Sequence, residues 1–415
     1  MLISAISIAL TFADTGTTDA TDCINNAIQA PGNRCGGGNA SVGSFCESST
    51  ITPALVYIPS GTYLVSGPLV MYYATQIVGD AVNPPTIKVA ASYTAGIGLA
   101  VFDADIYIPS AGGREWYANQ NNFFRQLRNI VIDMTTAPLT ATGIHWQVAQ
   151  ATHLNNIKIN MRSKSESKNQ QQGIFMENGS GGFMSDIIID GGAIGATLGS
   201  QQFTSRSLQI SNSGTAIQLV FDWVWLFMDL QITGCDVGID MTSGGFSNQA
   251  VGSVIVVDST ISATQGILTP YAPGYSSPQS AGSLMLENVD FTGASQAIAA
   301  AGGTSARTIL PGSQKIDLFA QGNAWTTAAQ SLDGQSFNGT VCSYGNTSQN
   351  SYTAQEMTIQ QTLSPVSRPA SLVDSNGNWF TRSKPQYEDV DVGEFSSALA
   401  NGLKGDGSTG RTSPT

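Results

Sequence analysis

The sequence predicts an all-β fold, a single parallel β-helix in which short strands wind into stacked coils. Three observations support this prediction. One local strand pattern recurs along the chain, its apolar residues alternate with period two, and the composition is rich in glycine and neutral polar residues. Only 11% of the residues are charged, 41% are hydrophobic, and 45 of the 415 are glycine. A helical solenoid would instead show apolar residues at i, i+3 and i+4 over a dozen positions.

The N-terminal stretch MLISAISIAL is apolar and short, and its pattern predicts a first β-strand. It has neither a basic n-region nor a clean cleavage site, so it does not match a secretory signal peptide. Residues 51–123 are expected to form the first coils, because ALVYIPSGTYLVSGPLVM contains two strands around a Ser-Gly-Thr turn. No apolar run is long enough to span a membrane, and we expect no membrane partner.

The central coils carry a repeat. Each copy is a short strand with a small polar residue just before its apolar alternation, and the seven copies are LRNIVIDM (from Leu127), LNNIKINM (Leu154), FMSDIIID (Phe183), FTSRSLQISN (Phe203), LFMDLQITG (Leu226), VVDSTISA (Val256) and LENVDFTG (Leu286). A small residue followed by isoleucine comes after the strands, at Gly143-Ile144, Gly173-Ile174, Ala193-Ile194, Ala216-Ile217, Gly238-Ile239, Gly266-Ile267 and Ala297-Ile298. The spacing of about 21 to 31 residues is typical of solenoids and predicts about seven coils. A β-sandwich is disfavoured, since its strands do not repeat one local pattern.

Two further segments follow the central coils. KIDLFAQGNAW, near residues 310–325, is expected to form a last coil. From about residue 343 to 378 the sequence is Ser, Thr, Asn and Gln without a period, which predicts a linker or a long wrapping segment.

Charge and cysteine content narrow the function. The net charge of −12 and the pI near 4.5 argue against a nucleic-acid partner and suit an uncharged substrate. The five cysteines contain no C-x-x-C pair, and we expect one loop disulfide plus buried free thiols among Cys23, Cys35, Cys46, Cys235 and Cys342. Glycosylation sequons, which favour a secreted glycoprotein, occur at Asn39, Asn178, Asn338 and Asn346.

Several stretches resemble a known family. VYIPSGTYLVSGPL resembles the first coils of the pectate-lyase-like β-helix superfamily. From about residue 50 to 390 the chain resembles the fungal exo-β-1,3-glucanases of glycoside hydrolase family 55. Four stretches carry this resemblance: NQNNFFRQLRNIVIDM (119–134), ATGIHWQVAQATHLNNIKINM (141–161), QGIFMENGSGGFMSDIIIDGG (172–192) and NWFTRSKPQYED (378–389). This resemblance implies two tandem right-handed β-helices side by side, with the substrate between them, in a secreted fungal enzyme. We expect a monomer that needs no cofactor.

The resemblance also implies how the chain is divided. GLKGDGSTG, from Gly402, resembles the opening of the second β-helix, and FADTGTTDATDCINNAIQA resembles an altered copy of the same opening, with a capping helix from Asp22 to Ala30. We therefore expect a β-helix domain at 1–342, a linker at 343–395 and the start of a second β-helix at 396–415. By this resemblance the chain represents the first half of a two-helix enzyme.

The implied reaction is inverting hydrolysis that releases glucose from the non-reducing end of β-1,3-glucan. Inversion needs a general acid and a positioned water on opposite faces of the sugar. In the family the acid is a glutamate of the second helix, beyond the end of this chain. The first half is expected to supply one wall of the cleft and polar groups that position water and sugar.

Two polar sets are the candidate site residues, and a parallel stack should bring them close together because they lie one repeat apart. Glu177 and Gln147 are the candidates for a catalytic role. The candidates for sugar binding are His145, Trp146, Gln150, Asn178 and Ser180. Structural roles are also possible: Glu177 could pair with Arg162 or Lys164, and Gln147 could be a turn amide.

Several other residues allow both a functional and a structural interpretation. His145 and His153 lack metal-site spacing to nearby acids, so no metal site is predicted. Trp223 and Trp225, two apart on one strand, favour packing on a shared face over a sugar platform. The aromatic loop REWYANQNNFF (114–124) could line a cleft.

Two other functions stay open at this point. One is a β-glucan-binding β-helix without turnover. The other is a polysaccharide lyase or polygalacturonase-like hydrolase that uses acids such as Glu177 and Asp190. A polyuronide substrate should favour a basic groove, so the acidic balance favours a neutral glucan.

Overall fold

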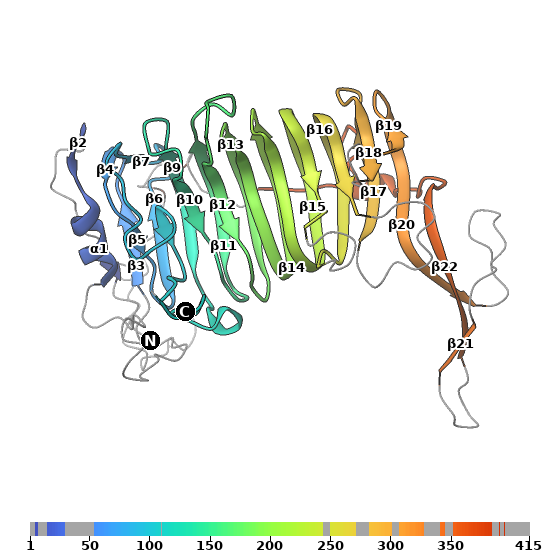
Figure 1. Cartoon of the computed structure of the whole chain (residues 1–415), viewed down its shortest axis with the longest axis horizontal. Coiled ribbons are helices and arrows are strands. Elements are labelled where there is room, and N and C mark those ends of the chain that lie inside the picture. The colour runs from blue at the N-terminus through green and yellow to red at the C-terminus, as the bar shows by residue number, and fades with distance from the viewer. Residues whose placement is uncertain are drawn as a thin grey trace, which may run out of the picture. The chain divides into compact units, whose positions relative to one another are not determined.

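The computed structural model describes residues 5–6, 15–29, 54–108, 110–243, 250–270, 282–300, 307–327, 341–344, 352–383, 390 and 394 (Figure 1). The chain divides into two compact units, which are described separately below. Unit 1 comprises Met1–Arg162 with Arg382–Thr415, and unit 2 comprises Ser163–Thr381. Among the described residues, no helix is long and apolar enough to cross a membrane.

Unit 1 is built from short parallel strands that stack in three columns. One column is β1, β3, β6, β9 and β11, a second is β2, β4, β7 and β9, and the third is β5, β8 and β10. The strands are β1 (Ala5–Ile6), β2 (Thr15–Asp19), β3 (Ala54–Ile58), β4 (Thr62–Val65), β5 (Leu69–Val70), β6 (Thr75–Gly79), β7 (Thr86–Val89), β8 (Phe102–Asp103), β9 (Gln126–Asp133), β10 (Thr142–His145) and β11 (His153–Asn160). Three parallel columns visited in turn by one chain are the arrangement of a β-helix, as predicted.

The helix α1 (Thr21–Gln29) covers the apolar interior at one end of unit 1. Its apolar face buries Ile24, Ala27 and Ile28, and Asp19 caps it by accepting the backbone N–H of Thr21 at 2.9 Å. This helix agrees with the capping helix expected at 22–30. By covering the end of the stack it protects the open strand edges from water and from pairing with other chains.

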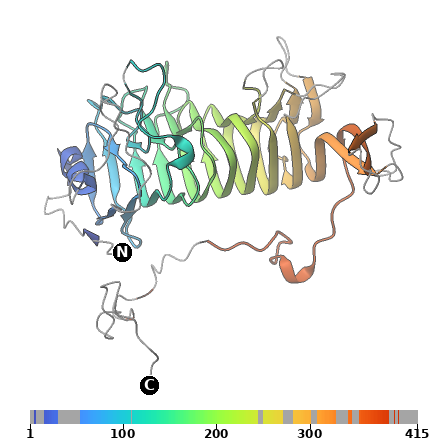
Figure 2. The same ribbon diagram turned by 90° about the horizontal axis from the view of Figure 1, so that it is seen from below.

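Unit 2 continues with longer parallel strands (Figure 2). These are β12 (Gln172–Met176), β13 (Gly182–Asp190), β14 (Ile194–Ser211), β15 (Thr215–Asp240), β16 (Ser253–Thr269), β17 (Ser283–Asp290) and β18 (Gln296–Ala300). The longest of them bend around the corners of a coil, so that one strand lies in more than one column. Inward side chains alternate with outward ones along each straight portion.

The corners are marked by polar residues in the left-handed region. Each is the small polar residue that precedes the apolar alternation in the sequence repeat, and their φ angles lie between 49° and 58°: Asn129, Asn156, Asp186, Ser207, Asp229, Asp258 and Asn288. Asn and Asp tolerate this conformation better than other non-glycine residues. Their side chains also bond along the stack, as Asn156 Nδ2 donates to Asn129 Oδ1 at 3.0 Å in unit 1. Ser207 likewise donates to Asp229 at 2.8 Å in unit 2, and such contacts between corner residues of successive coils are called the turn ladder here.

The interior is lined by stacked, buried apolar side chains. The isoleucines of the second marker are fully buried at Ile144, Ile174, Ile217, Ile239, Ile267 and Ile298. In unit 2 the ring of Trp225 stacks between Phe203 at 4.7 Å and Phe227 at 5.8 Å between centroids. Such aromatic pairs add about 0.5–1.5 kcal/mol to the burial of their area. Cys235 is a buried thiol, as expected, whereas Cys35 and Cys46 lie outside the described residues.

The end of unit 2 differs from the prediction. KIDLFAQGNAW lies in β20 (Lys315–Thr327), which pairs antiparallel with β17 and does not form a parallel coil. β19 (Arg307–Pro311) pairs antiparallel with β18, since only six residues separate them and a parallel return needs a dozen or more. Part of the predicted linker forms β22 (Tyr352–Thr362), antiparallel to β20 and to β21 (Val341–Tyr344).

An extended segment, residues 363–381, follows β22 and is called the strap here (Figure 2). Its one short helical turn is η2 (Ala370–Leu372). The strap lies against the outward side of β16 and β17, where Arg368 and Trp379 contact Asp258 and Glu287. The unpatterned polar sequence therefore wraps along the coils over this stretch.

Candidate functional site

The unit 1 cluster consists of Asp103, Glu115, Asn119, His145 and Gln147, drawn from two paired strands and a loop. β8 and β10 are in register at Asp103 and His145, so the two side chains project side by side. His145 Nδ1 lies 2.9 Å from Asp103 Oδ1, and both residues are completely buried. Such a contact fixes the orientation of the imidazole ring.

Gln147 is the centre of this cluster and is also completely buried. Its Nε2 donates to Glu115 Oε1 at 2.6 Å, and its Oε1 accepts from Asn119 Nδ2 at 3.3 Å. Two side chains from the loop 114–124 therefore help to orient the side chain of Gln147. Glu115 and Asn119 belong to the aromatic loop 114–124, which here contributes carboxylate and amide groups as well as rings.

Burial and hydrogen bonds set the protonation of the acids in unit 1. Burial alone would raise the pKa of Asp103, but the charge and hydrogen bond of His145 and two backbone N–H groups hold it below its ordinary value. Burial raises the pKa of Asp105 to about 9 and also raises the pKa of Glu115. Asp105 is therefore a neutral acid at pH 7, and its Oδ2 has no hydrogen-bond partner among the described residues.

A buried arginine stands next to these acids. Arg125 is completely buried, donates to Asn122 Oδ1 and to the carbonyl of Met71, and lies 4.9 Å from the ring centroid of Tyr117. Asn122 in turn donates to the carbonyl of Gln147 at 2.6 Å. The chain of contacts supports the Gln147 turn from beneath and makes it rigid.

The second predicted set lies in unit 2, in the turn between β12 and β13. Glu177 and Asn178 are half-buried and Ser180 is 5% exposed. The next coil packs closely against this turn, because a Cβ on Gly199 would lie 2.8 Å from the Glu177 carbonyl oxygen. A glycine is required at that position for the two coils to approach each other.

One coil further, unit 2 holds a carboxylate that sequence reasoning passed over. Asp222 is 2% exposed, and its Oδ1 accepts the backbone N–H groups of Gly252 and Ser253 at 3.0 and 2.9 Å. Burial raises its pKa to about 6, although those two hydrogen bonds oppose the shift. Asp222 is in register with Ser200 of the preceding coil. The aspartate directly before the two tryptophans of FDWVWLF was the available signal.

The structure places the other predicted residues as follows. Trp146 is completely buried, so its ring offers no face to solvent, and Gln150 is exposed. Trp225 is buried but Trp223 is 59% exposed, so the expectation of a shared face is wrong. A corner lies between them: residues 223 and 224 are both exposed, which breaks the period-two alternation.

Two residues from the alternative interpretations, Lys164 and Asp190, have partners of their own in the structure. Lys164 pairs with Asp236 at 2.7 Å and not with Glu177. Asp190 accepts from Ser211 and Asn212 in the turn ladder, at 2.6 and 2.7 Å. Within the described part of the chain, no group of three His, Cys, Asp or Glu side chains could hold a metal ion. The expected proximity of the Gln147 and Glu177 sets stays a prediction, since the sets belong to different units.

The comparisons with known proteins show the family to which the chain belongs and its similarity to named fungal proteins. The family described as "Rhamnogalacturonase A/epimerase, pectate lyase-like" matches residues 12–240. The chain is 40% identical to a "Probable glucan endo-1,3-beta-glucosidase" of Arthroderma benhamiae, over 96% of this chain and 51% of the relative. It is 36% identical to a "Glucan 1,3-beta-glucosidase" of Cochliobolus carbonum, over 96% of this chain and 46% of the relative. The resemblance to fungal β-1,3-glucanases is confirmed.

A third relative carries a different name. A "Non-secreted LysM effector LysM19" of Penicillium expansum is 41% identical, over 96% of this chain and 29% of the relative. The chain spans about half the length of the two glucosidase relatives and less of this one.

Proposed function

The chain belongs to the rhamnogalacturonase A/epimerase, pectate lyase-like family, and from this premise we propose that it acts on β-1,3-glucan as one half of a two-helix glycoside hydrolase. The reaction is inverting hydrolysis that releases glucose from the chain end. The fungal relatives support an extracellular location, with the sequons as glycosylation sites. The single observation that carries the assignment is 40% identity to a protein named as a glucan endo-1,3-beta-glucosidase and 36% identity to one named as a glucan 1,3-beta-glucosidase.

Gln147 is the proposed positioning residue of unit 1. It is completely buried, so it acts through the half-buried Glu115, which it holds at 2.6 Å, while Asn119 holds the other end of its amide at 3.3 Å. A carboxylate that is held in advance loses little freedom when a hydroxyl binds, which is how a site favours one sugar orientation. The Asp103–His145 pair holds the neighbouring strand end in place.

Glu177, Asn178 and Ser180 are the proposed sugar contacts of unit 2. Glu177 is a half-buried acid in a turn of uncharged residues, where it would accept hydroxyl hydrogen bonds. The general acid is assigned to the part of the relatives that this chain does not span. A chain with only these groups should bind glucan and release little glucose on its own.

The test measures glucose release from laminarin and retention on insoluble β-1,3-glucan, using the 415-residue chain. Gln147→Ala and Glu177→Gln should each weaken retention, and Gln209→Ala, an exposed amide of β14, is the matched control. Retention without glucose release is the expected result. Fast glucose release that Glu177→Gln abolishes would show that this β-helix is a complete enzyme with Glu177 as its acid. Absence of both retention and release would refute the proposal.

A further inference from the structure

The outward side of unit 2 carries a row of five residues, called the outer stripe. Each is in register with the next across five consecutive strands, β13 to β17: Phe183, Thr204, Leu226, Ile255 and Met285. The residues that follow them face inward and are buried, so period-two alternation places the stripe on the outside. Phe183 and Met285, at the two ends, are each 37% exposed.

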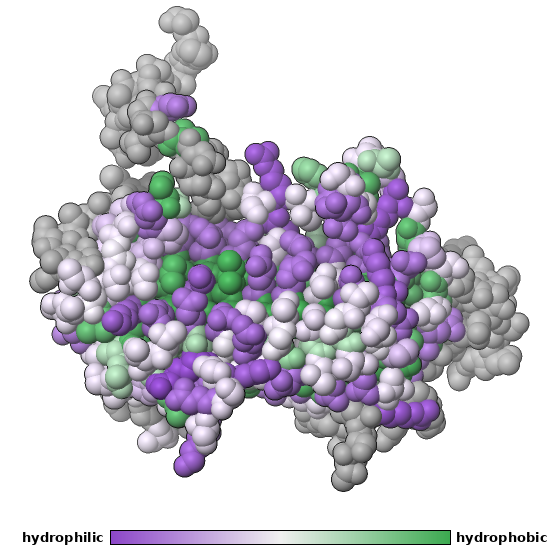
Figure 3. Space-filling model, turned by 90° about the horizontal axis from the view of Figure 1, so that it is seen from above, coloured by the Kyte–Doolittle hydropathy of each residue, from purple (hydrophilic) through white to green (hydrophobic). Residues whose placement is uncertain are grey.

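The stripe and the flank two positions before it are uncharged, whereas the flank two positions after it carries Arg206, which pairs with Asp186 at 3.6 Å, and Glu287. None of the five residues has a charge, nor do the residues two positions before them on β14 to β17, which are Gln202, Val224, Ser253 and Ser283. Figure 3 shows that apolar side chains gather only in small patches among polar ones on the face in view. A neutral, hydroxyl-bearing ligand matches such a surface better than a charged one.

Val224 extends the surface on β15, two residues before Leu226, and Trp223 lies beside it at the corner of the coil. Trp223 is 59% exposed and Val224 is 37% exposed. The neighbouring residue on one side is Gly252, which has no side chain to cover the ring. On the other side the neighbour is Gln201, an amide between the paired positions Ser200 and Gln202. An open aromatic face beside an amide suits a sugar ring, which has apolar C–H patches and hydroxyl groups.

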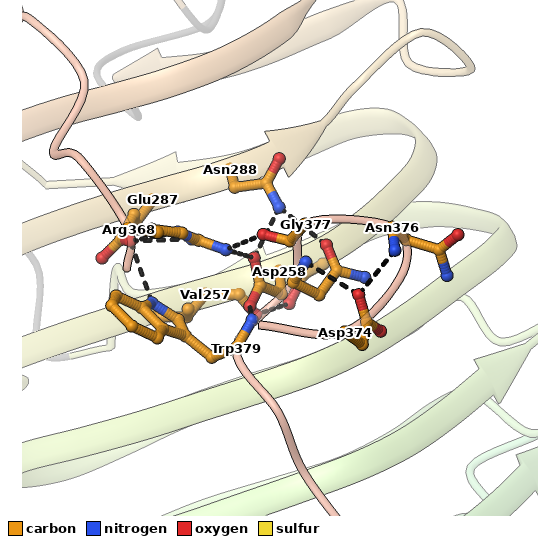
Figure 4. A network of polar contacts seen from close by, with 11 residues as sticks. Val257, Asp258, Glu287, Asn288, Arg368, Asp374, Asn376, Gly377 and Trp379 are labelled. Atoms are coloured by element: carbon orange, nitrogen blue, oxygen red, sulfur yellow. Dashed lines mark hydrogen bonds and ion pairs between the residues drawn. The ribbon is translucent and has the colours of Figure 1, made fainter. Parts of the chain in front are cut away.

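The strap binds the acidic residues that lie beside the stripe on β16 and β17. Two residues beyond the stripe on β17 is Glu287, whose carboxylate binds Arg368 of the strap at 2.7 Å and the indole N–H of Trp379 at 3.0 Å (Figure 4). Arg368 also pairs with Asp258 at 2.6 Å. These acids are therefore neutralised from within the chain, and they do not repel or attract a ligand on the stripe.

The size of the surface decides its occupant. With aromatic side chains of about 150–250 Å², the exposed parts of Trp223, Val224, Phe183 and Met285 amount to about 300–400 Å². A stable protein interface needs about 800 Å² on each partner. The stripe is long and narrow, because it crosses coils that are about 4.8 Å apart. A single polysaccharide chain fits this shape, with one sugar ring near each coil.

We propose that Trp223, Val224 and the outer stripe form a second glucan-binding surface of unit 2, which holds a neutral β-glucan chain across the strands. The inference rests on the proposed function for its choice of glucan. It is separate from the polar turns assigned above, because it requires none of Gln147, Glu177 or Ser180. The surface would keep an insoluble glucan in place while its end is processed elsewhere.

The test is affinity electrophoresis in laminarin, together with depletion by insoluble β-1,3-glucan, using the whole chain. Trp223→Ala and Phe183→Ser should each weaken binding about fivefold to tenfold, and Trp223→Tyr should retain most of it. The matched control is Ile188→Ser, which removes a side chain that is 40% exposed on the same strand, beyond the corner at Asp186. Thermal unfolding of each variant should match the parent, since all these positions are exposed.

The outcomes separate the two proposals. If the parent chain binds no glucan, the proposed function fails and this inference fails with it. If the parent binds and Gln147→Ala weakens binding, but both stripe variants bind like Ile188→Ser, only this inference is overturned. If the stripe variants change the sedimentation of the chain and leave glucan binding intact, the surface is a protein interface, which also overturns it.

Discussion

Arg368 of the strap neutralises two carboxylates at once, and its removal gives a sharp test of how the strap is held. Its Nη1 lies 2.6 Å from Asp258 Oδ1 and its Nη2 lies 2.7 Å from Glu287 Oε1. The side chains are only 12%, 4% and 14% exposed, in the order Arg368, Asp258 and Glu287. The guanidinium also lies 4.9 Å from the ring centroid of Trp379 (Figure 4).

The magnitude follows from this burial. Removal of one partner from a buried ion pair costs about 3–5 kcal/mol, because the remaining charge is left without compensation. In Arg368→Met the strap can detach and let water reach both acids, so the loss is limited to the docking of the strap. We expect the free energy of strap opening to fall by about 3 kcal/mol, which is more than 100-fold in the opening equilibrium.

Amide hydrogen exchange measures this opening directly. Exchange at residues 371–380 should accelerate more than 100-fold in Arg368→Met, while exchange in the buried strand β15 changes little. Lys164→Met is the matched control, since its partner Asp236 is 66% exposed and such pairs contribute about 0–1 kcal/mol. Unchanged exchange in the strap of Arg368→Met would refute the reasoning.

Three further predictions concern the acids and the turn ladder. Burial raises the pKa of Asp222 to about 6, which is above its value in the unfolded chain. The folded state should therefore lose up to about 3 kcal/mol of stability as the pH rises from about 4 to 6. In Asp222→Asn the midpoint of urea unfolding should depend less on pH over that range, and an unchanged pH dependence would contradict the prediction. At pH 7, Asp105→Asn should lower the free energy of unfolding by less than about 1 kcal/mol, because Asp105 is already neutral. Asp103→Asn should lower it by about 3 kcal/mol, because His145 loses its carboxylate partner. Equal losses of stability in urea unfolding would show that the two acids share one charge state. Asn156→Val should destabilise by about 2–3 kcal/mol in a left-handed corner and Asn156→Gly by less than about 1 kcal/mol; thermal unfolding that ranks them the other way would disprove strain at that corner.

The repeat made most of the fold predictable. The small polar residue before each apolar alternation is a corner residue with positive φ, so its position in sequence fixes where each coil turns. The second marker, a small residue before isoleucine, identifies the buried position of the next column in six of its seven copies, and Ile194 of the remaining copy is half-buried. Both signals are local, because each coil pairs only with its neighbours.

The end of the stack was less predictable, for a physical reason. KIDLFAQGNAW alternates like the other strands, and alternation does not distinguish a parallel from an antiparallel neighbour. The direction is set by the short connections before β20, and β22 forms from a polar segment only because β20 offers it an open edge.

In the candidate site, too, some residues could be predicted from the sequence and others could not. Gln147 and His145 could be chosen from residue type and repeat position, but their partners Glu115 and Asp103 come from a loop and a strand 32 and 42 residues earlier. Such contacts depend on how the loop folds back, which no spacing rule describes. Trp223 and Trp225 could not be separated by alternation, because a corner falls between them.

The most direct test of the central claim compares the affinity of the 415-residue chain for two soluble polysaccharides of opposite character. Laminarin is a neutral β-1,3-glucan, and polygalacturonate is a polyanion. Isothermal titration at moderate salt should show binding to laminarin and at least tenfold weaker binding to polygalacturonate, because the chain is acidic and its outer stripe is uncharged. Tighter binding to polygalacturonate would contradict the assignment of β-1,3-glucan as the substrate.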